Sequence, residues 1–156
     1  MKTTNKGKLM PGILILALML SLFSAVHAQS ISKTDNKMKM LIQLTTGTEN
    51  PTRAALAFLV AKTAIEEGHT VTMFLAGDAV QLIRDNVLDN LSGLGTGKLR
   101  EHFDAIIKGG GKFYLSGNSS KARGVTEADI KNKSAEFALP NILVHLITEN
   151  EKILSY

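Results

Sequence analysis

Short apolar runs that alternate with helical patterns are the feature of this chain that most restricts its fold. Residues 38–44 are mostly apolar, and so are residues 70–76 and 112–116. Runs of this length and composition are typical of parallel strands covered on both faces. Because parallel strands need a crossover between them, usually a helix, this order predicts an α/β fold.

The expected architecture is a small doubly wound, flavodoxin-like three-layer sandwich with a mainly parallel sheet of four to five strands. A last apolar run, residues 152–156, closes the chain. Periodicity alone does not decide whether residues 142–147 form a helix or a strand. We expect a helix there, because the last strand follows within a few residues and a parallel partner needs a crossover.

Two loops are expected to converge at one end of this sheet. In a flavodoxin-type strand order, 2-1-3-4, the chain reverses direction between the first and third strands, and ligands bind at such points. The loop of residues 45–50 then lies beside the loop of residues 116–124. The alternative is that both are ordinary solvated turns. Asn50 is placed to cap the helix that begins at Pro51, and Asp78 to cap the helix after the second run.

The helix predicted over residues 51–67 contains eight consecutive apolar residues, 54–61. A helix packed on one face of a sheet needs only an apolar stripe. Two interpretations stay open for the apolar residues beyond such a stripe. The small alanines tolerate exposure to water, or the segment forms a subunit interface.

The first 28 residues have the composition of an export signal. Three lysines precede an almost wholly apolar stretch, residues 13–26, which ends in small residues of the kind that signal peptidase reads. The alternative is a retained membrane anchor, but Pro11 and Gly12 shorten the apolar stretch. We therefore expect a cleaved signal peptide over residues 1–28, a flexible lead-in over residues 29–37, one domain over residues 38–156, and a periplasmic location.

Charge and cysteine content narrow the function classes. The chain has 18 basic and 14 acidic residues, and three of the basic ones lie in the signal segment, which leaves 15 against 14. This near balance gives no electrostatic basis for binding nucleic acid. The chain has no cysteine, so it has neither a disulfide nor a lipid-anchoring thiol. No membrane association is expected after signal cleavage, and packing with oligomerisation must stabilise the fold.

Hydroxyl and cationic side chains gather on the loop after the third apolar run. Hydroxyl donors, cations and the positive end of a helix together favour negative charge, so we expect a non-covalent site for a small anion. The candidate ligand-binding residues are Thr45, Thr46, Asn50, Ser116, Ser119, Ser120, Lys121 and Arg123. The alternative for Arg123 is structural, with its guanidinium bound to a carboxylate such as Glu49 or to backbone carbonyls.

No catalytic residue, metal or cofactor is expected. Ser116 as a hydrolase nucleophile would need a base, but His69 is expected at the opposite end of the sheet. The residues around Ser116 are not a G-x-S-x-G elbow. The histidines are scattered without paired carboxylates, which argues against a metal site. Residues 92–98 lack the spacing of a phosphate-binding loop and are interpreted as a flexible loop.

The succession of these segments resembles the DsrE/DsrF-like family, including its YchN-like branch. The resemblance rests on residues 73–80, on the Arg-Gly pair at residues 123–124, and on residues 151–156, and it covers essentially the whole mature chain. It implies the same α/β fold, assembly as a trimer or hexamer, and, in many members, persulfide relay by cysteines in the third-strand loop. Ser116 and Ser119 stand at the two positions where YchN-like proteins carry cysteine.

This replacement of cysteine by serine changes the expected mechanism. Sulfur relay needs a thiolate that holds sulfur as a persulfide, and a serine hydroxyl cannot form one. We therefore expect a periplasmic homo-oligomer that binds a small molecule or a partner protein non-covalently. Two alternatives stay open: an accessory subunit of a sulfur-relay assembly, in which a DsrE-family partner supplies the thiol, and a hydrolase that uses Ser116.

Overall fold

The computed structural model describes residues 37–156. The expected signal peptide, residues 1–28, and all but the last residue of the lead-in lie outside the described residues. Among residues 37–156, no helix is long and apolar enough to cross a membrane.

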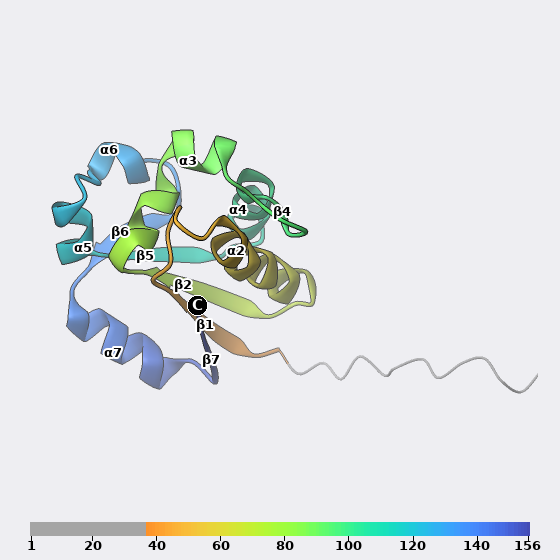
Figure 1. The fold of residues 1–156 in the computed structure, drawn as a ribbon. Coiled ribbons are helices and arrows are strands. Elements are labelled where there is room, and N and C mark those ends of the chain that lie inside the picture. The colour runs from red at the N-terminus through yellow and green to blue at the C-terminus, as the bar shows by residue number, and fades with distance from the viewer. Residues whose placement is uncertain (1–36) are drawn as a thin grey trace, which may run out of the picture. The chain divides into compact units, whose positions relative to one another are not determined.

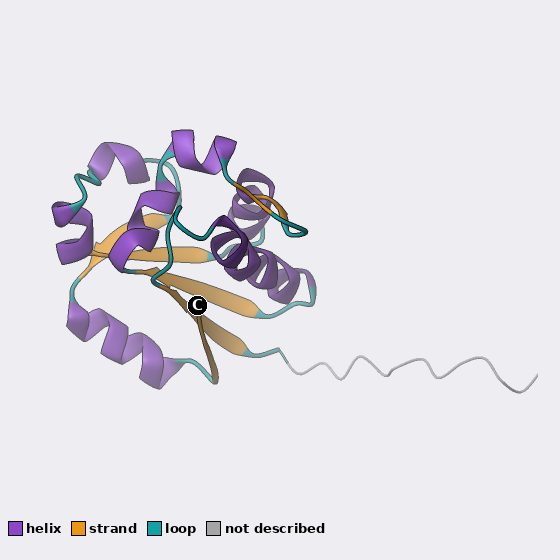
Figure 2. Ribbon diagram, in the orientation of Figure 1, coloured by secondary structure: helices purple, strands orange, loops and turns teal. Residues whose placement is uncertain are grey.

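Five parallel strands form the central sheet, which confirms the predicted α/β class (Figures 1 and 2). Their bounds are β1 Lys39–Leu44, β2 Thr70–Leu75, β5 Lys112–Ser116, β6 Ala135–Ala138 and β7 Lys152–Ser155. The apolar runs of the sequence supply β1, β2 and β5. The fourth strand, β6, was not expected, because it contains only four residues and carries a glutamate.

The strand order is β6-β5-β2-β1-β7, so the expected order 2-1-3-4 is wrong. The chain adds β2, β5 and β6 successively on one side of β1, and then returns to place β7 on the other side of β1. The reversal point therefore lies between β1 and β7. Hydrophobic periodicity marks where strands occur but carries no information on their order, which explains the error.

Helices cover both faces of the sheet. They are α2 Pro51–Glu66, the 3₁₀ helix η1 Gly77–Ile83, α3 Asp85–Asn90, α4 Leu99–Lys108, α5 Gly117–Ala122, α6 Glu127–Ile130 and α7 Pro140–Glu149. Helix α7 lies on the opposite face from α2 and α4 (Figure 1). The expectation of a helix over residues 142–147 is therefore confirmed.

The larger core lies between the sheet and α2 with α4. The apolar segment 54–61 of α2 packs into this core, and Ala57 and Phe58 are fully buried. The Phe113 ring of β5 lies 5.7 Å from the Phe58 ring and 5.2 Å from the Phe103 ring. The alanines of this segment are buried and let α2 pack closely onto its own sheet, so the interpretation that they are exposed to water is wrong. Leu56 in the same segment is 38% exposed, and a subunit interface there stays a prediction.

The opposite face has a much smaller core. Leu146 of α7 packs with Leu41, Phe74 and Ala138 of the sheet. Four large apolar side chains remain exposed on this face. Val144 (60% exposed) and Ile147 (41%) are on α7, Leu139 (63%) immediately precedes α7, and Ile153 (44%) is on β7. This set is named the α7 surface below.

Of the local features predicted from the sequence, some are confirmed and others are wrong. Asn50 caps α2 as expected, since its Oδ1 accepts the Arg53 N–H at 3.1 Å. Asp78 caps nothing, and the helix expected after β2 is divided at Arg84, which is extended, into η1 and α3. Residues 92–98 are not a free loop, because strands β3 Ser92–Gly93 and β4 Gly97–Lys98 pair into a hairpin.

Candidate functional site

The loop expected after β5 turns directly into a short helix, α5, which begins beside Ser116. The Ser116 hydroxyl accepts the Ser119 N–H at 3.4 Å and so caps this helix. Ser116 has an extended backbone and α5 is six residues long. The first candidate hydroxyl therefore serves the local fold.

The Ser119 hydroxyl connects this region to the segment after β2. Its Oγ accepts the N–H of Gly77 at 3.0 Å. Gly77 has a positive φ of 55°, a conformation that favours glycine, and the carbonyl oxygen of Thr45 would lie only 3.3 Å from a Cβ there. Ser119 thus holds two neighbouring turns of the sheet edge together.

Arg123 forms an ion pair with Asp78. The Arg123 Nε donates to Oδ1 of Asp78 at 2.7 Å, and its second nitrogen Nη1 is 3.4 Å from the Ser119 carbonyl oxygen. Arg123 thus makes contacts of the kind that its structural interpretation predicts, but its carboxylate partner is Asp78 and not Glu49. The Glu49 carboxylate accepts the Gly47 N–H instead, at 2.8 and 3.0 Å.

Arg84 is a further positioning residue that sequence reasoning missed. Its Nη2 donates to the carbonyl oxygens of Arg123 at 2.9 Å and Gly124 at 2.7 Å. This guanidinium fastens the turn that follows α5. The partners lie 39 and 40 residues away along the chain, and no local sequence pattern indicates such a contact.

The two loops that were expected to be neighbours are separated by the segment after β2. Because β2 lies between β1 and β5 in the sheet, Gly77 and Asp78 stand between loop 45–50 and loop 116–124. A Cβ at Gly47 would lie 2.7 Å from the Asp78 carbonyl oxygen, so the first loop closely contacts this segment. The expected shared crevice between the loops is replaced by these contacts.

The candidate residues of the first loop contribute to the fold of the sheet edge. The N–H and hydroxyl of Thr45 both contact the Tyr156 carbonyl oxygen, at 3.0 and 3.2 Å, which joins the ends of β1 and β7. Thr46 is half-buried beside it. Asn50 caps α2. None of these side chains lines the same hollow as the loop after β5.

Ser120 and Lys121 line an open hollow of about 380 Å³ on the outer side of α5. The hollow, named the Ser120 hollow below, is also lined by Gly117, Gly124, Val125, Thr126 and Phe137. Ser120 is only 1% exposed, and its hydroxyl has no hydrogen-bond partner among residues 37–156. Of the eight candidate residues, these two are the ones that the structure brings together at a hollow.

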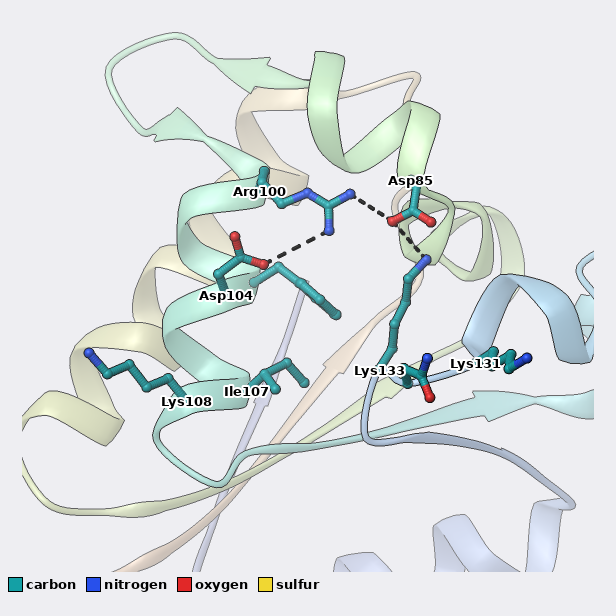
Figure 3. A pocket seen from close by; sticks show the side chains of 9 residues that line it. Asp85, Arg100, Asp104, Ile107, Lys108, Lys131 and Lys133 are labelled. Atoms are coloured by element: carbon teal, nitrogen blue, oxygen red, sulfur yellow. Dashed lines mark hydrogen bonds and ion pairs between the residues drawn. The ribbon is translucent and has the colours of Figure 1, made fainter.

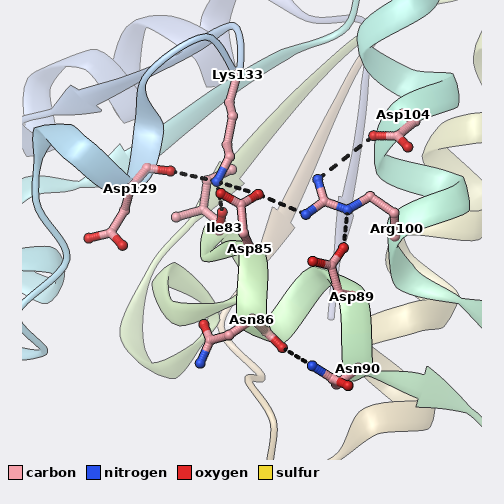
Figure 4. Close-up of polar contacts among 9 residues, drawn as sticks. All are labelled: Ile83, Asp85, Asn86, Asp89, Asn90, Arg100, Asp104, Asp129 and Lys133. Atoms are coloured by element: carbon pink, nitrogen blue, oxygen red, sulfur yellow. Dashed lines mark hydrogen bonds and ion pairs between the residues drawn. The ribbon is translucent and has the colours of Figure 1, made fainter.

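A second polar cluster lies between α3, α4 and the segment before β6 (Figures 3 and 4). The Lys133 ammonium, on a residue only 7% exposed, donates to the carbonyl oxygens of Ile83 and Asp129, both at 2.8 Å, and lies 3.0 Å from Oδ1 of Asp85. The same Asp85 oxygen accepts a bond from Arg100 at 2.7 Å. Every charge in this chain of contacts has a partner.

The cluster has the chemistry of a structural anchor. Hydrogen bonds from Arg100 and then Lys133 lower the pKa of Asp85 below its usual 3.8. The hollow beside it, about 460 Å³, is bordered by these same groups, but the Lys133 ammonium already uses three donors within the protein. We therefore assign the cluster to folding, where it attaches the β6 segment to α3 and α4.

The rings of His69 and His102 bind backbone groups. His69, just before β2, accepts the Met38 N–H on Nδ1 at 3.3 Å, and His102 on α4 contacts the Thr96 carbonyl oxygen through Nε2 at 2.6 Å. His69 stands at the amino end of β2, whereas Ser116 stands at the carboxyl end of β5. Among residues 37–156, no group of three histidine or carboxylate side chains is arranged to hold a metal ion.

A family model identifies the family of this chain, and two solved structures share its fold. The model of the DsrE/DsrF-like family matches residues 38–156. The structure is similar to that of the YchN protein from E. coli, with a TM-score of 0.60 at 12% identity over 77% of this chain and 99% of YchN. It is also similar to a conserved protein of unknown function, BT1422 from Bacteroides thetaiotaomicron, with a TM-score of 0.57 at 18% identity over 83% of this chain and 100% of BT1422. No curated protein sequence matches the chain. The chain belongs to the DsrE/DsrF-like family.

Proposed function

We propose that this protein is an exported DsrE-like binding protein that takes up a small anion or a partner protein without carrying sulfur covalently. The observation that supports this proposal best is the state of the two motif serines. The Ser116 hydroxyl caps α5, and the Ser119 hydroxyl accepts the Gly77 N–H. Both hydroxyls therefore have structural partners at the positions where a sulfur carrier needs a thiolate.

The chemistry of serine supports the same proposal. A thiolate attacks a sulfur donor and keeps the transferred atom as a persulfide, whereas a serine hydroxyl is far less acidic and forms no such bond. The family is associated with sulfur relay. In that context we propose a non-covalent binder, and any thiol in an assembly would come from another subunit.

Self-association is the second part of the proposal. The α7 surface exposes four large apolar side chains on the face of the sheet that has the smaller core. An apolar patch of this kind on a secreted chain is typical of an interface. We assign it to a second copy of the same chain; a cysteine-bearing DsrE-family partner on this surface is the alternative outcome of the same test.

Native mass spectrometry of the gently purified protein tests the proposal. The expected spectrum contains a whole-number multiple of the chain mass, with a small molecule that dissociates on denaturation. A mass increment that survives denaturation and is removed by a thiol reductant would contradict non-covalent binding. Co-purification of a cysteine-bearing homologue in place of self-association would identify the accessory-subunit alternative.

A further inference from the structure

The Ser120 hollow has the position and size of a small-ligand site. It lies at the carboxyl end of the sheet, between α5, the turn at Gly124 and the end of β6. Ligands of open α/β sheets bind outside this end of the strands, although the hollow stands apart from the reversal point between β1 and β7. Its volume of about 380 Å³ falls within the range of about 300–1,000 Å³ found for such pockets. Gly117, the residue that follows β5, and Phe137, near the end of β6, both line it.

The rim of the hollow is held by the protein itself. Arg84 binds the carbonyl oxygens of Arg123 and Gly124, and Gly124 has a φ of 63°, which favours glycine. The Val125 N–H donates to the Ser120 carbonyl oxygen at 2.9 Å and closes the turn. A rim fixed by these contacts does not depend on a ligand for its shape, which lowers the entropic cost of binding.

The lining combines an apolar wall with a single charged residue and with Thr126, whose hydroxyl already donates to Asp129. Phe137 is half-buried and Val125 is buried, and both present apolar groups. Lys121 is the charged residue of the lining, and it has no ion pair among residues 37–156. The neighbouring cation, Arg123, is already paired with Asp78. The available charge at this hollow is therefore the Lys121 ammonium.

Ser120 adds an unexplained polar group. A buried hydroxyl without a partner destabilises the folded state, so native proteins contain few of them. The Ser120 hydroxyl is one of these within the described part of the chain, and Ser120 lines the hollow. Rotation about its Cα–Cβ bond changes the direction of the hydroxyl, which both donates and accepts.

We propose that the Ser120 hollow binds a small organic anion, with its acidic group at Lys121 and Ser120 and its apolar body against Phe137 and Val125. This inference rests on the proposed function, because it names the ligand class of a non-covalent binder. A purely inorganic anion would leave the apolar wall in contact with water. A neutral apolar molecule would leave the Lys121 ammonium and the Ser120 hydroxyl unpaired.

Calorimetric titration of the mature protein with benzenesulfonate tests the ligand class. We expect benzenesulfonate to bind at least about tenfold more tightly than sulfate or benzyl alcohol, which lack the apolar body and the charge respectively. Lys121→Ala should weaken benzenesulfonate binding about tenfold. Lys112→Ala should not, because Lys112 is an exposed lysine at the other end of β5.

A Ser120→Ala variant separates a binding role from a structural one. We expect it to weaken benzenesulfonate binding about fivefold while the melting temperature of the ligand-free protein stays unchanged or rises, because an unpaired buried hydroxyl is removed. A lower melting temperature would give the hydroxyl a structural role and overturn its assignment to the ligand. Absence of benzenesulfonate binding, or equal affinity in Lys121→Ala, would overturn the proposed site. A covalent sulfur adduct would contradict the proposed function but would leave this titration interpretable.

Discussion

Arg123 and Asp78 are joined across the sheet edge, with the Arg123 Nε 2.7 Å from Oδ1 of the Asp78 carboxylate. The contact links the turn after α5 to the first turn after β2. The same contact engages the Arg123 guanidinium, one of the two cations that the sequence suggested for an anion site. Our proposal therefore gives the anion-binding role to Lys121, two residues earlier.

Arg123→Ala should destabilise the ligand-free protein. We expect the free energy of unfolding to fall by about 1 kcal/mol, because the variant loses a half-exposed ion pair and a contact with the Ser119 carbonyl oxygen. Urea denaturation measures this change. Asp78→Ala should cost a similar amount, and the double variant less than the sum of the two. Additive losses would mean that the two side chains do not interact in solution.

Lys133→Met should be considerably more harmful. Removal of this buried ammonium leaves two carbonyl oxygens and Asp85 without their donor, which we expect to cost about 2–4 kcal/mol of unfolding free energy. The matched control is Lys131→Met, an exposed position two residues earlier, which should change stability by less than about 0.5 kcal/mol. Equal effects of the two substitutions in thermal denaturation would contradict an anchoring role for Lys133.

Asp85 should make the stability of the protein depend on acid pH. Its pKa is lowered in the folded state by Arg100 and Lys133, so its contribution to stability is fully present above its unfolded pKa of 3.8. The contribution is lost as the pH falls through the lowered folded value. Wild type should therefore be more stable than Asp85→Asn near neutral pH, and the difference should shrink below pH 3.8. A pH-independent difference in the urea midpoint would contradict this linkage.

Local features of the fold were predictable from the sequence. The apolar runs identified β1, β2 and β5, and the Asn50-Pro51 pair identified the start of α2, because these signals depend on residues that are close in the chain. The placement of α7 followed from chain geometry, since β7 needed a crossover. The short elements escaped this reasoning: strand β6 with its four residues, the β3-β4 hairpin, and helix α5.

The candidate site was less accessible to sequence reasoning, because it depends on contacts between distant segments. The bond from Arg84 to the turn at Gly124 and the pair between Arg123 and Asp78 span 39 to 45 residues. The wrong strand order placed loop 45–50 beside loop 116–124, whereas Asp78 lies between them. The unpaired hydroxyl of Ser120 has no sequence signal at all, since it follows from how α5 packs.

Substitutions on the α7 surface should disrupt self-association without unfolding the chain. Val144→Glu and Ile147→Glu place charges on exposed apolar positions, and we expect them to reduce the oligomer to monomers in multi-angle light scattering. Ala128→Glu, at an exposed position on α6, is the matched control and should leave the assembly intact. By contrast, Ala57→Glu should unfold the protein, because Ala57 is fully buried. A wild type that is strictly monomeric at micromolar concentration would contradict self-association.

The central claim is that this DsrE/DsrF-like protein does not carry sulfur covalently, and intact-mass spectrometry after treatment with a persulfide donor tests it most directly. The wild type should gain no sulfur mass that a thiol reductant removes, because the chain has no cysteine. Ser119→Cys is the positive control. Its sulfur would stand beside the Gly77 N–H and near Arg123, which favour a thiolate, and it should gain such a mass. A reducible sulfur adduct on the wild-type protein would contradict the account.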